Sequence, residues 1–397
     1  MLYIVETTVY NRITDMIYQF PGLETPDHDV LGLIHKQRAE LQYLINQNPV
    51  RWTGSLRRNT FARAVQGSNS IEGYIANLAE AIEIIDDGKP ENVEEETIKA
   101  LNGYRQAMTY ILQIHGDPHS EINQQLVRSL HYMMMSYDMT KLPGQWRRGP
   151  IYVVSGDGET VYEGPSANLV PVLVDELIGQ MKSSPDADAM VCGAMAHLNL
   201  AMIHPFKDGN GRMARALQTL LLSRDGILSP IYSSIEEWLG RNTKSYYGIL
   251  SVTGNGKWSP NNSALSWVRF CLHAHYQQGA TLISRNYEIA RVWEQVSAII
   301  SGSGLPERAE SALIDAALGY RIRNSRYRKE SKISEVVASR DLKRLCVMGL
   351  LSAVGEKRGR FYVASEELKK MYLAARDNSK ADNVYELVGA KGISHAS

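Results

Sequence analysis

Apolar residues recur at helical spacing along most of the 397-residue chain, and this periodicity restricts the fold more than any other sequence feature. The sequence contains no repeat of fixed period and no low-complexity run. The pattern therefore predicts a mainly α-helical protein, with helices, in chain order, at residues 31–46, 61–85, 97–114, 122–137, 169–181, 187–204, 211–223, 235–253 and 265–300.

Composition narrows the class of protein. Hydrophobic residues make up 44% and charged residues 22% of the chain, which is ordinary for a globular protein. The 43 basic and 43 acidic side chains cancel, so the molecule as a whole is not drawn to nucleic acid or to anionic membranes. No apolar stretch approaches the roughly 18 residues of a membrane span, and no secretory signal is visible at the N-terminus. We expect a soluble, cytoplasmic protein.

One segment interrupts the helical pattern. Two runs of β-branched and aromatic residues, 151–154 and 160–162, flank the sequence Ser-Gly-Asp-Gly-Glu and predict a β-hairpin. Such a hairpin either connects and covers helices, or offers an exposed edge strand to which an extended peptide can add. The residues alone favour neither alternative.

The residue composition and the pattern of predicted elements change after residue 300. Small residues and a proline at 301–306 predict a linker, and an amphipathic helix at about 334–351 is followed by a strand pair with its turn at 355–359. This order predicts a winged helix-turn-helix domain. Between residues 307 and 370, 15 Lys or Arg outnumber 9 Asp or Glu by six, which fits DNA contact and equally fits a protein-binding or dimerising module.

The segment with the most candidate functional side chains is His204-Pro-Phe-Lys-Asp208-Gly-Asn-Gly-Arg212-Met-Ala-Arg215. The helix before it is apolar nearly all round, which predicts burial, and it ends at His204 because a proline follows. A new helix begins after the glycines. The segment is therefore a tight loop between two helices.

This loop combines groups that suit phosphate chemistry. Gly209 and Gly211 allow positive φ, Asn210 is a plausible helix cap, and the first N–H groups of the next helix form an anion site. Arg212 and Arg215 add two guanidinium groups on one side of the first turn. Two further residues complete the set: a carboxylate for Mg²⁺ at Asp208 and a general base near neutral pKa at His204.

The segment resembles the Fic family signature, H-x-F-x-D/E-G-N-G-R-x-x-R, at every specified position. The resemblance implies a Fic-type helical bundle that transfers AMP from ATP to a hydroxyl side chain of a target protein. By the same resemblance, His204 deprotonates the hydroxyl, Asp208 holds Mg²⁺ and Phe206 anchors the loop. The implied ATP ligands are Gly209, Asn210, Gly211, Arg212 and, for the γ-phosphate, Arg215.

A second match lies upstream. Ser68-Asn-Ser-Ile-Glu72-Gly73 fits the family's inhibitory motif, S/T-x-x-x-E-G/N, although Ser followed four residues later by Glu is common on any helix. The resemblance implies that Glu72 pairs with Arg215 and denies it to the γ-phosphate. Some members use this glutamate to remove AMP, which leaves both directions of the reaction open.

The resemblance also assigns roles outside these motifs. The hairpin from Ile151 to Tyr162 falls where the family places its target-binding flap, which raises the edge-strand alternative. Tyr246 and Tyr247 fall where relatives contact adenosine, although a core role for either is as plausible. A C-terminal winged helix is a frequent companion in the family, and a homodimer is the expected assembly.

These observations predict four regions. Residues 1–58 form an N-terminal helical extension, and 59–300 form the Fic core, with an inhibitory helix at about 61–73 and a flap at about 150–164. Residues 301–376 form the winged helix, and 377–397 a frayed tail. The alternative to a self-inhibited adenylyltransferase is a winged-helix DNA-binding regulator whose Fic domain mainly senses nucleotide. The intact base at position 204 favours the enzyme, with transfer of another phosphate-containing group as a variant.

Overall fold

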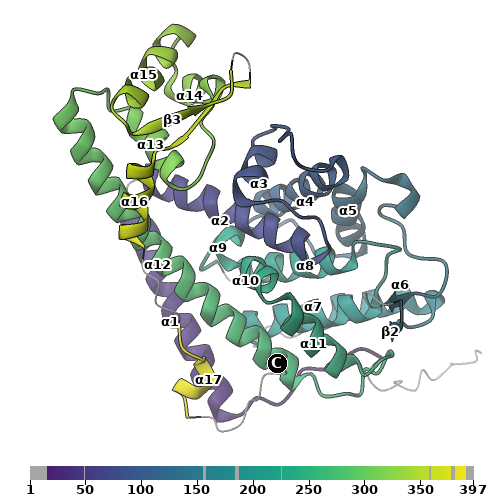
Figure 1. Ribbon diagram of the computed structural model, residues 1–397. Helices are drawn as coiled ribbons and strands as arrows, with labels where there is room; N and C mark the ends of the chain where they lie inside the picture. The colour runs from purple at the N-terminus through teal and green to yellow at the C-terminus, as the bar shows by residue number, and fades with distance from the viewer. Residues whose placement is uncertain are drawn as a thin grey trace, which may run out of the picture.

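The structure is a computed structural model that describes residues 16–389, apart from 49, 155–157, 184–186, 225, 357–358 and 377–380 and the side chains of 50–52. Two long helices, α1 (Thr25–Gln47) and α12 (Leu265–Ser303), lie side by side along one flank of the molecule (Figure 1). A capping box between Glu24 and Asp27 begins α1. The remaining helices pack on one side of this pair, and the C-terminal segment lies over its end.

The centre of the molecule is the pair α7 (Ala189–Ile203) and α8 (Asn210–Ser223). Ala196, Leu200 and Ile203 of α7 belong to one apolar cluster, and Met190 and Leu198 belong to another. The helix is apolar all round because neighbours cover both sides. The first cluster adds α4 (Glu95–Ile114), α5 (Gln124–Met135) and α6 (Val170–Ser183), and the second adds α1, α11 (Thr243–Gly254) and α12.

Two predicted helices are broken in the structure. The helix predicted over 61–85 is wrong: α2 (Val50–Ile71) ends before Gly73, which has φ +88°, and α3 (Leu78–Ile85) begins at an Asn77 capping box. The boundary predicted at residue 58 therefore falls inside α2. The helix predicted over 235–253 is interrupted at Asn242, between α10 (Glu236–Arg241) and α11. The short helix α9 (Pro230–Ser233) precedes them.

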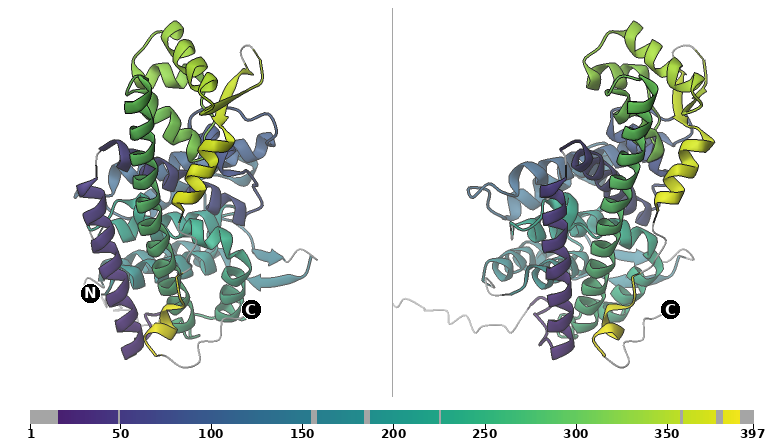
Figure 2. Two further views of the ribbon diagram at one scale, coloured as in Figure 1. Left: turned by 60° about the vertical axis from the view of Figure 1, so that its left-hand side comes forward. Right: turned by 90° about the vertical axis from the view of Figure 1, so that its left-hand side faces the viewer.

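The predicted hairpin is present and projects from the helical body (Figure 2, left). Strand β1 (Tyr152–Val154) pairs antiparallel with β2 (Thr160–Glu163), with a register shift between Val153 and Val154. Most of the predicted turn, 155–157, lies outside the described residues. A turn at 254–256 lies beside the end of β2, where Gly256 O accepts from Glu163 N at 3.0 Å. Short 3₁₀ helices flank the hairpin: η1 (Met139–Lys141) and η2 (Ala167–Leu169).

We call residues 309–375 the C-terminal module. Its elements are α13 (Ala309–Ala317), α14 (Asn324–Ser331), α15 (Glu335–Val347), β3 (Leu351–Val354), β4 (Phe361–Ala364) and α16 (Glu366–Ala375). The order of helices followed by an antiparallel strand pair is the order expected of a winged helix, an assignment that stays a prediction. Residues 357–358, in the predicted turn, lie outside the described part.

The linker predicted over 301–306 is wrong in its first half, because α12 continues to Ser303. The module also shares a core with the preceding helices: Leu56 of α2 and Trp293 of α12 belong to the same apolar cluster as Leu313 and Leu342. Packing on both sides therefore stabilises the end of α12 despite its small residues.

The predicted tail is only partly described, and its described part is ordered against the body. The turn α17 (Val384–Leu387) packs on α1 and α12, and the Tyr385 hydroxyl donates to Asp27 Oδ1 at 3.1 Å. Val384 and Tyr385 are buried, so fraying is wrong for this turn. Within the described ranges, no helix is both long and apolar enough to cross a membrane.

Candidate active site

His204 terminates α7 in the left-handed conformation, with φ 51°. Its Nδ1 lies 3.0 Å from Ala201 O, and a carbonyl can only accept, so Nδ1 carries the proton of the neutral ring. This tautomer leaves Nε2 as the basic nitrogen. Burial lowers the pKa of His204 from its ordinary value, so the ring is neutral at pH 7.

Arg147, which the sequence did not single out, holds the backbone around His204. Its Nε donates to His204 O at 2.8 Å, and its terminal nitrogens donate to the carbonyls of Gly149, Pro165 and Ile203. The side chain is buried and joins the end of α7 to both ends of the hairpin. A single arginine in a loop follows no sequence pattern, so only tertiary contacts show this role.

Asn210 closes the loop in a way that differs from the prediction. It is the first residue of α8 rather than its cap, because Gly209, with φ +76°, occupies the cap position. The Asn210 side chain accepts from Phe206 N at 2.8 Å and donates to Phe206 O at 2.9 Å. The amide thus braces residues 206–210 from within.

His131 is a second residue that the sequence did not mark. Its ring stacks on buried Phe206 with centroids 3.6 Å apart, which agrees with the anchoring role expected of that phenylalanine. Nε2 donates to Asp208 O at 2.9 Å and Nδ1 accepts from Gly144 N at 2.9 Å. Burial lowers the pKa of His131 to about 4, so the ring stays neutral and keeps this bonding pattern.

Asp208 forms an ion pair with a lysine side chain. Its Oδ2 lies 3.0 Å from the ammonium of Lys141, at the end of η1, and its Oδ1 accepts from Gly209 N at 2.6 Å. Burial alone would raise the pKa of this carboxyl, but the ammonium and the N–H outweigh burial and lower it. Asp208 is therefore an ionised carboxylate that attracts positive charge.

Arg212 is fully buried in the first turn of α8. One terminal nitrogen lies 3.1 Å from Met135 Sδ, and the guanidinium carbon lies 5.0 Å from the centre of the Tyr74 ring. Its Nε and other terminal nitrogen have no hydrogen-bond partner among the described residues. A buried cation with two unused donors is suited to an anionic ligand.

Arg215 is bound by both residues of the upstream motif. It donates through Nε to Ser68 Oγ at 2.8 Å and through one terminal nitrogen to Ser68 O at 2.9 Å and to Glu72 Oε1 at 2.6 Å. Burial acts to lower the pKa of Arg215, but the Glu72 carboxylate outweighs burial and raises it. The contact that the sequence motif implied is therefore present, across 143 residues of sequence.

The Glu72 carboxylate also lies against the N-terminus of α8. A Cβ atom on Gly211 would collide with Glu72 Oε1, so a side chain at this position would displace the carboxylate. Met213 N donates to Gly209 O, so the N–H groups before it have no acceptor within the helix. An anionic side chain thus occupies the position predicted to bind phosphate.

The side chains of Tyr246 and Tyr247 lie in different environments. The hydroxyl of buried Tyr246 lies 2.9 Å from Nε2 of His197 and 3.5 Å from an Arg215 nitrogen, so this residue belongs to the core beneath the arginine. The Tyr247 side chain is 46% exposed, and its hydroxyl donates to Ile71 O at 3.2 Å. Of the two, only Tyr247 lies at the surface beside the end of α2.

A loop that contains histidine, glycines and arginines joins the two central helices, and a hairpin lies beside it. This arrangement is characteristic of one class of protein. Residues 121–222 match the model of the Fic/DOC family, and this range contains the hairpin, α7 and α8 but not α2. This part of the chain is therefore similar to the Fic/DOC family.

Similar proteins carry a specific name. Protein adenylyltransferase fic-1 of Caenorhabditis briggsae is 25% identical over 250 residues, which are 60% of this chain and 45% of that protein. Protein adenylyltransferase Fic of Aedes aegypti is 27% identical over 210 residues, or 51% of this chain and 39% of that protein. This chain thus spans less than half of the length of these relatives.

Solved structures share the fold. A Fic family protein from Desulfovibrio desulfuricans G20 superposes with a TM-score of 0.56 at 20% identity, covering 88% of this chain and 99% of that chain. A Fic domain containing signaling protein from Bacteroides thetaiotaomicron has a TM-score of 0.53 at 18% identity, over 65% of this chain and 96% of that chain. The likeness to the first extends well beyond the matched domain.

Proposed function

We propose that this chain is a protein adenylyltransferase that moves AMP from ATP to a Ser, Thr or Tyr hydroxyl of a target protein and that Glu72 inhibits this reaction. One observation carries the proposal: a carboxylate, bound to Arg215, lies at the N-terminus of α8 beside the loop of His204. A carboxylate and a phosphate are bound by the same donors, so this position is chemically an anion site. The names of the relatives support the direction of transfer.

In the proposed reaction each of these groups has one role. His204 Nε2 accepts the proton of the target hydroxyl, whose oxygen then attacks the α-phosphorus of ATP. The new P–O bond forms as the bond from the α-phosphorus to the bridging oxygen breaks, and pyrophosphate leaves. Arg212 and the N–H groups of α8 stabilise the charge that develops on the phosphate oxygens. Arg215 binds the terminal phosphate once Glu72 has moved away.

The residues present fit Mg²⁺. The Lys141 ammonium on Asp208 shows that this carboxylate accepts a cation. Among the described residues, no three His, Cys, Asp or Glu side chains gather, so a Mg²⁺ held by Asp208 would take its other ligands from phosphate oxygens and water. When bound there, the ion would neutralise charge on the polyphosphate.

Replacing Lys141 with methionine is expected to tighten the binding of Mn²⁺, used as the probe, to nucleotide-free protein by about three- to tenfold. The ammonium occupies Asp208 Oδ2 and repels a second cation by roughly 1 kcal/mol or more at such a distance. Electron paramagnetic resonance of free Mn²⁺ measures the affinity. Lys207→Met is the matched control, since that ammonium donates to Thr140 O at 3.0 Å instead. Equal affinities in the two variants would contradict the assignment of Asp208.

The hairpin is proposed as the docking strand for the target. Tyr152, Val154 and Val161 expose apolar side chains on it, and β1 pairs with β2 alone among the described residues. The Tyr162 hydroxyl donates to Met202 O at 2.7 Å, which fixes β2 to the end of α7. An extended peptide added to β1 would place its side chains beside His204.

The C-terminal module remains proposed as a winged helix that binds a partner, and a homodimer remains the proposed assembly. Several arginines of its basic cluster are already engaged in ion pairs: Arg321 and Arg323 with Glu83, and Arg326 with Asp86. Helix α15 instead exposes Val336 and Val347 on its outer side. These contacts support a protein partner more than DNA.

Labelled ATP tests the proposed reaction. Purified protein incubated with α-labelled ATP and Mg²⁺ is expected to acquire label on itself, and the same incubation with γ-labelled ATP is not. His204→Ala should abolish the labelling without loss of nucleotide binding, because the base does not hold the phosphates. Label from γ-labelled ATP, or undiminished labelling of His204→Ala, would exclude the mechanism.

A further inference from the structure

The helix that carries Ser68 and ends directly before Glu72 is attached to the C-terminal module at its other end. Helix α2 runs between the active site and the module, and α3 follows it beside the module (Figure 1). Glu72 follows Arg58 by 14 positions and comes directly after the last residue of α2, which corresponds to about 21 Å of helix. A continuous helix of this length transmits a displacement of one end to the other.

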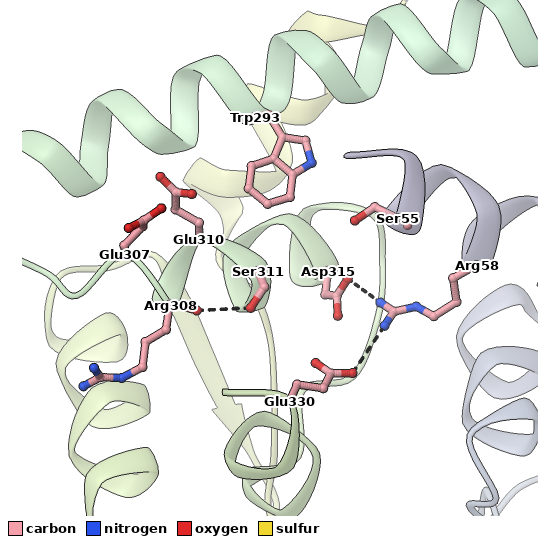
Figure 3. A pocket seen from close by; sticks show the side chains of 10 residues that line it. Ser55, Arg58, Trp293, Glu307, Arg308, Glu310, Ser311, Asp315 and Glu330 are labelled. Atoms are coloured by element: carbon pink, nitrogen blue, oxygen red, sulfur yellow. Dashed lines mark hydrogen bonds and ion pairs between the residues drawn. The ribbon is translucent and has the colours of Figure 1, made fainter. Parts of the chain in front are cut away.

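Arg58 makes the first attachment. It pairs with Asp315 of α13 and lies 3.7 Å from Glu330 of α14 (Figure 3). Its guanidinium carbon lies 4.5 Å from the centre of the Tyr320 ring. The neighbouring Asn59 donates to the Tyr320 hydroxyl at 3.0 Å. Asp315 is buried, and its carboxylate also lies 4.0 Å from Arg326 of α14, so Arg58 is one of two arginines beside it.

Helix α3 and the turn after it make the second attachment. Glu83 is buried and lies 2.6 Å from Arg323 and 3.1 Å from Arg321 of the module. Asp86 pairs with Arg326. Acidic groups on the α2–α3 segment therefore face arginines of the module, while Arg58 faces a carboxylate in return. We call the pairs of Arg58, Glu83 and Asp86 with the module the clamp.

The packing beside Arg58 is open. A pocket of about 380 Å³ lies between α2, α12 and the module, with Arg58 and Asp315 on its wall (Figure 3). Apolar contacts of Leu56 and Ile82 join the two parts elsewhere. The ion pairs of Arg58 therefore lie beside a space that side chains do not fill, and they add to these apolar contacts in holding α2 against the module.

We propose that the clamp positions Glu72 on Arg215 and that the C-terminal module is where the signal that relieves inhibition acts. The inference rests on the proposed function, since it assigns a control to the same site. A partner that binds the module and moves it away from α2 and α3 shifts the far end of α2. Arg58 and Glu83 are then positioning residues, which touch neither ATP nor the target.

The test combines clamp variants with the inhibitory glutamate. Glu83→Gln and Asp315→Asn together are expected to raise self-labelling from α-labelled ATP by about three- to tenfold when Glu72 is present, a usual size for coupling between sites. In a Glu72→Gly background the same pair should change labelling by less than about 1.5-fold, because no inhibition remains to relieve. Arg308→Gln is the control, since it breaks the ion pair, at 2.7 Å, between Arg308, the residue directly before the module, and Asp341 of α15, without touching α2 or α3.

A second readout needs no catalysis. Hydrogen exchange of the amides of residues 66–73 is expected to quicken in the clamp variant and to stay unchanged in Arg308→Gln. Arg321→Gln, a milder change at a partly exposed residue, serves if the double variant does not fold, because Arg323 still pairs with Glu83.

The outcomes separate the two proposals. If Glu72→Gly raises labelling and the clamp variant leaves both labelling and exchange unchanged, the clamp is wrong and the proposed function stands. If the clamp variant raises labelling equally in both backgrounds, its effect does not pass through Glu72 and the inference is overturned. If Glu72→Gly itself has no effect on labelling, inhibition at this site fails, and unchanged exchange would reject the clamp independently.

Discussion

Glu72→Gly should transfer AMP about 10- to 100-fold faster than the wild-type protein, as measured by self-labelling from α-labelled ATP. The carboxylate contacts Arg215 at 2.6 Å and lies against Gly211, so it competes with phosphate for both donors. A charge-assisted hydrogen bond of this kind contributes about 1.5–3 kcal/mol, and its removal makes that free energy available for binding ATP productively.

The same variant is expected to lose stability in the absence of nucleotide. Arg215 is buried, and without Glu72 it keeps Ser68 but has no carboxylate, which costs roughly 2–4 kcal/mol. Saturating ATP should therefore raise the melting temperature of Glu72→Gly more than that of the wild type. Glu72→Gln, which keeps the shape and loses the charge, should fall between the two. Labelling that stays at the wild-type level while ATP binds would contradict self-inhibition.

Arg147→Met should destabilise the protein by about 3–5 kcal/mol and lower AMP transfer by about two orders of magnitude or more. The substitution leaves the carbonyls of His204, Gly149 and Pro165 without their charged donor in a buried place. His204 then loses the contact that holds its left-handed conformation, and a displaced base transfers protons poorly.

Thermal unfolding and self-labelling measure the two effects of this change. Arg148→Met is the matched control, since the neighbouring arginine is exposed and bonds only to Gln145 Oε1, at 3.2 Å, among the hydrogen bonds of the described residues. The control should behave like the wild type in both measurements. Similar melting temperatures for the two variants would show that Arg147 does not support the loop.

The clamp and the contact between Glu72 and Arg215 are connected through α2. Glu72 is placed by α2, α2 is placed by its contacts with the module, and the module is placed on the end of α12. A change at the module surface can thus reach the phosphate site through a single helix. This connection is why we place the releasing signal there rather than at the hairpin.

Local chemistry allowed the sequence to predict much of the site. The apolar pattern of α7, its end before Pro205 and the glycines at the start of α8 lie within a few residues of one another, and backbone preferences act over that range. The same local signals predicted the hairpin at β1 and β2.

The sequence prediction was wrong at three places, where a helix break, a longer helix and a different cap were found. Apolar periodicity continues from α2 into α3, and the break after Ile71 depends on the positive φ of Gly73 and the Asn77 cap. The small residues at 301–303 read as a linker, yet α12 continues through them from Ile300, which belongs to the core shared with the module. Gly209 occupies the cap position of α8, so the side chain of Asn210 instead forms a hydrogen bond with the backbone of Phe206.

The sequence by itself determined the reactive loop, because its groups lie within 12 consecutive residues and covalent spacing holds them together. The tertiary structure alone decided what surrounds it. Arg147 and His131 brace the loop from segments that follow no motif, and Lys141 neutralises Asp208. A buried charge needs a partner of opposite charge or a hydrogen-bonding group. Which residues lie close enough to serve depends on how the helices pack together, and the order of the helices in the chain does not determine this.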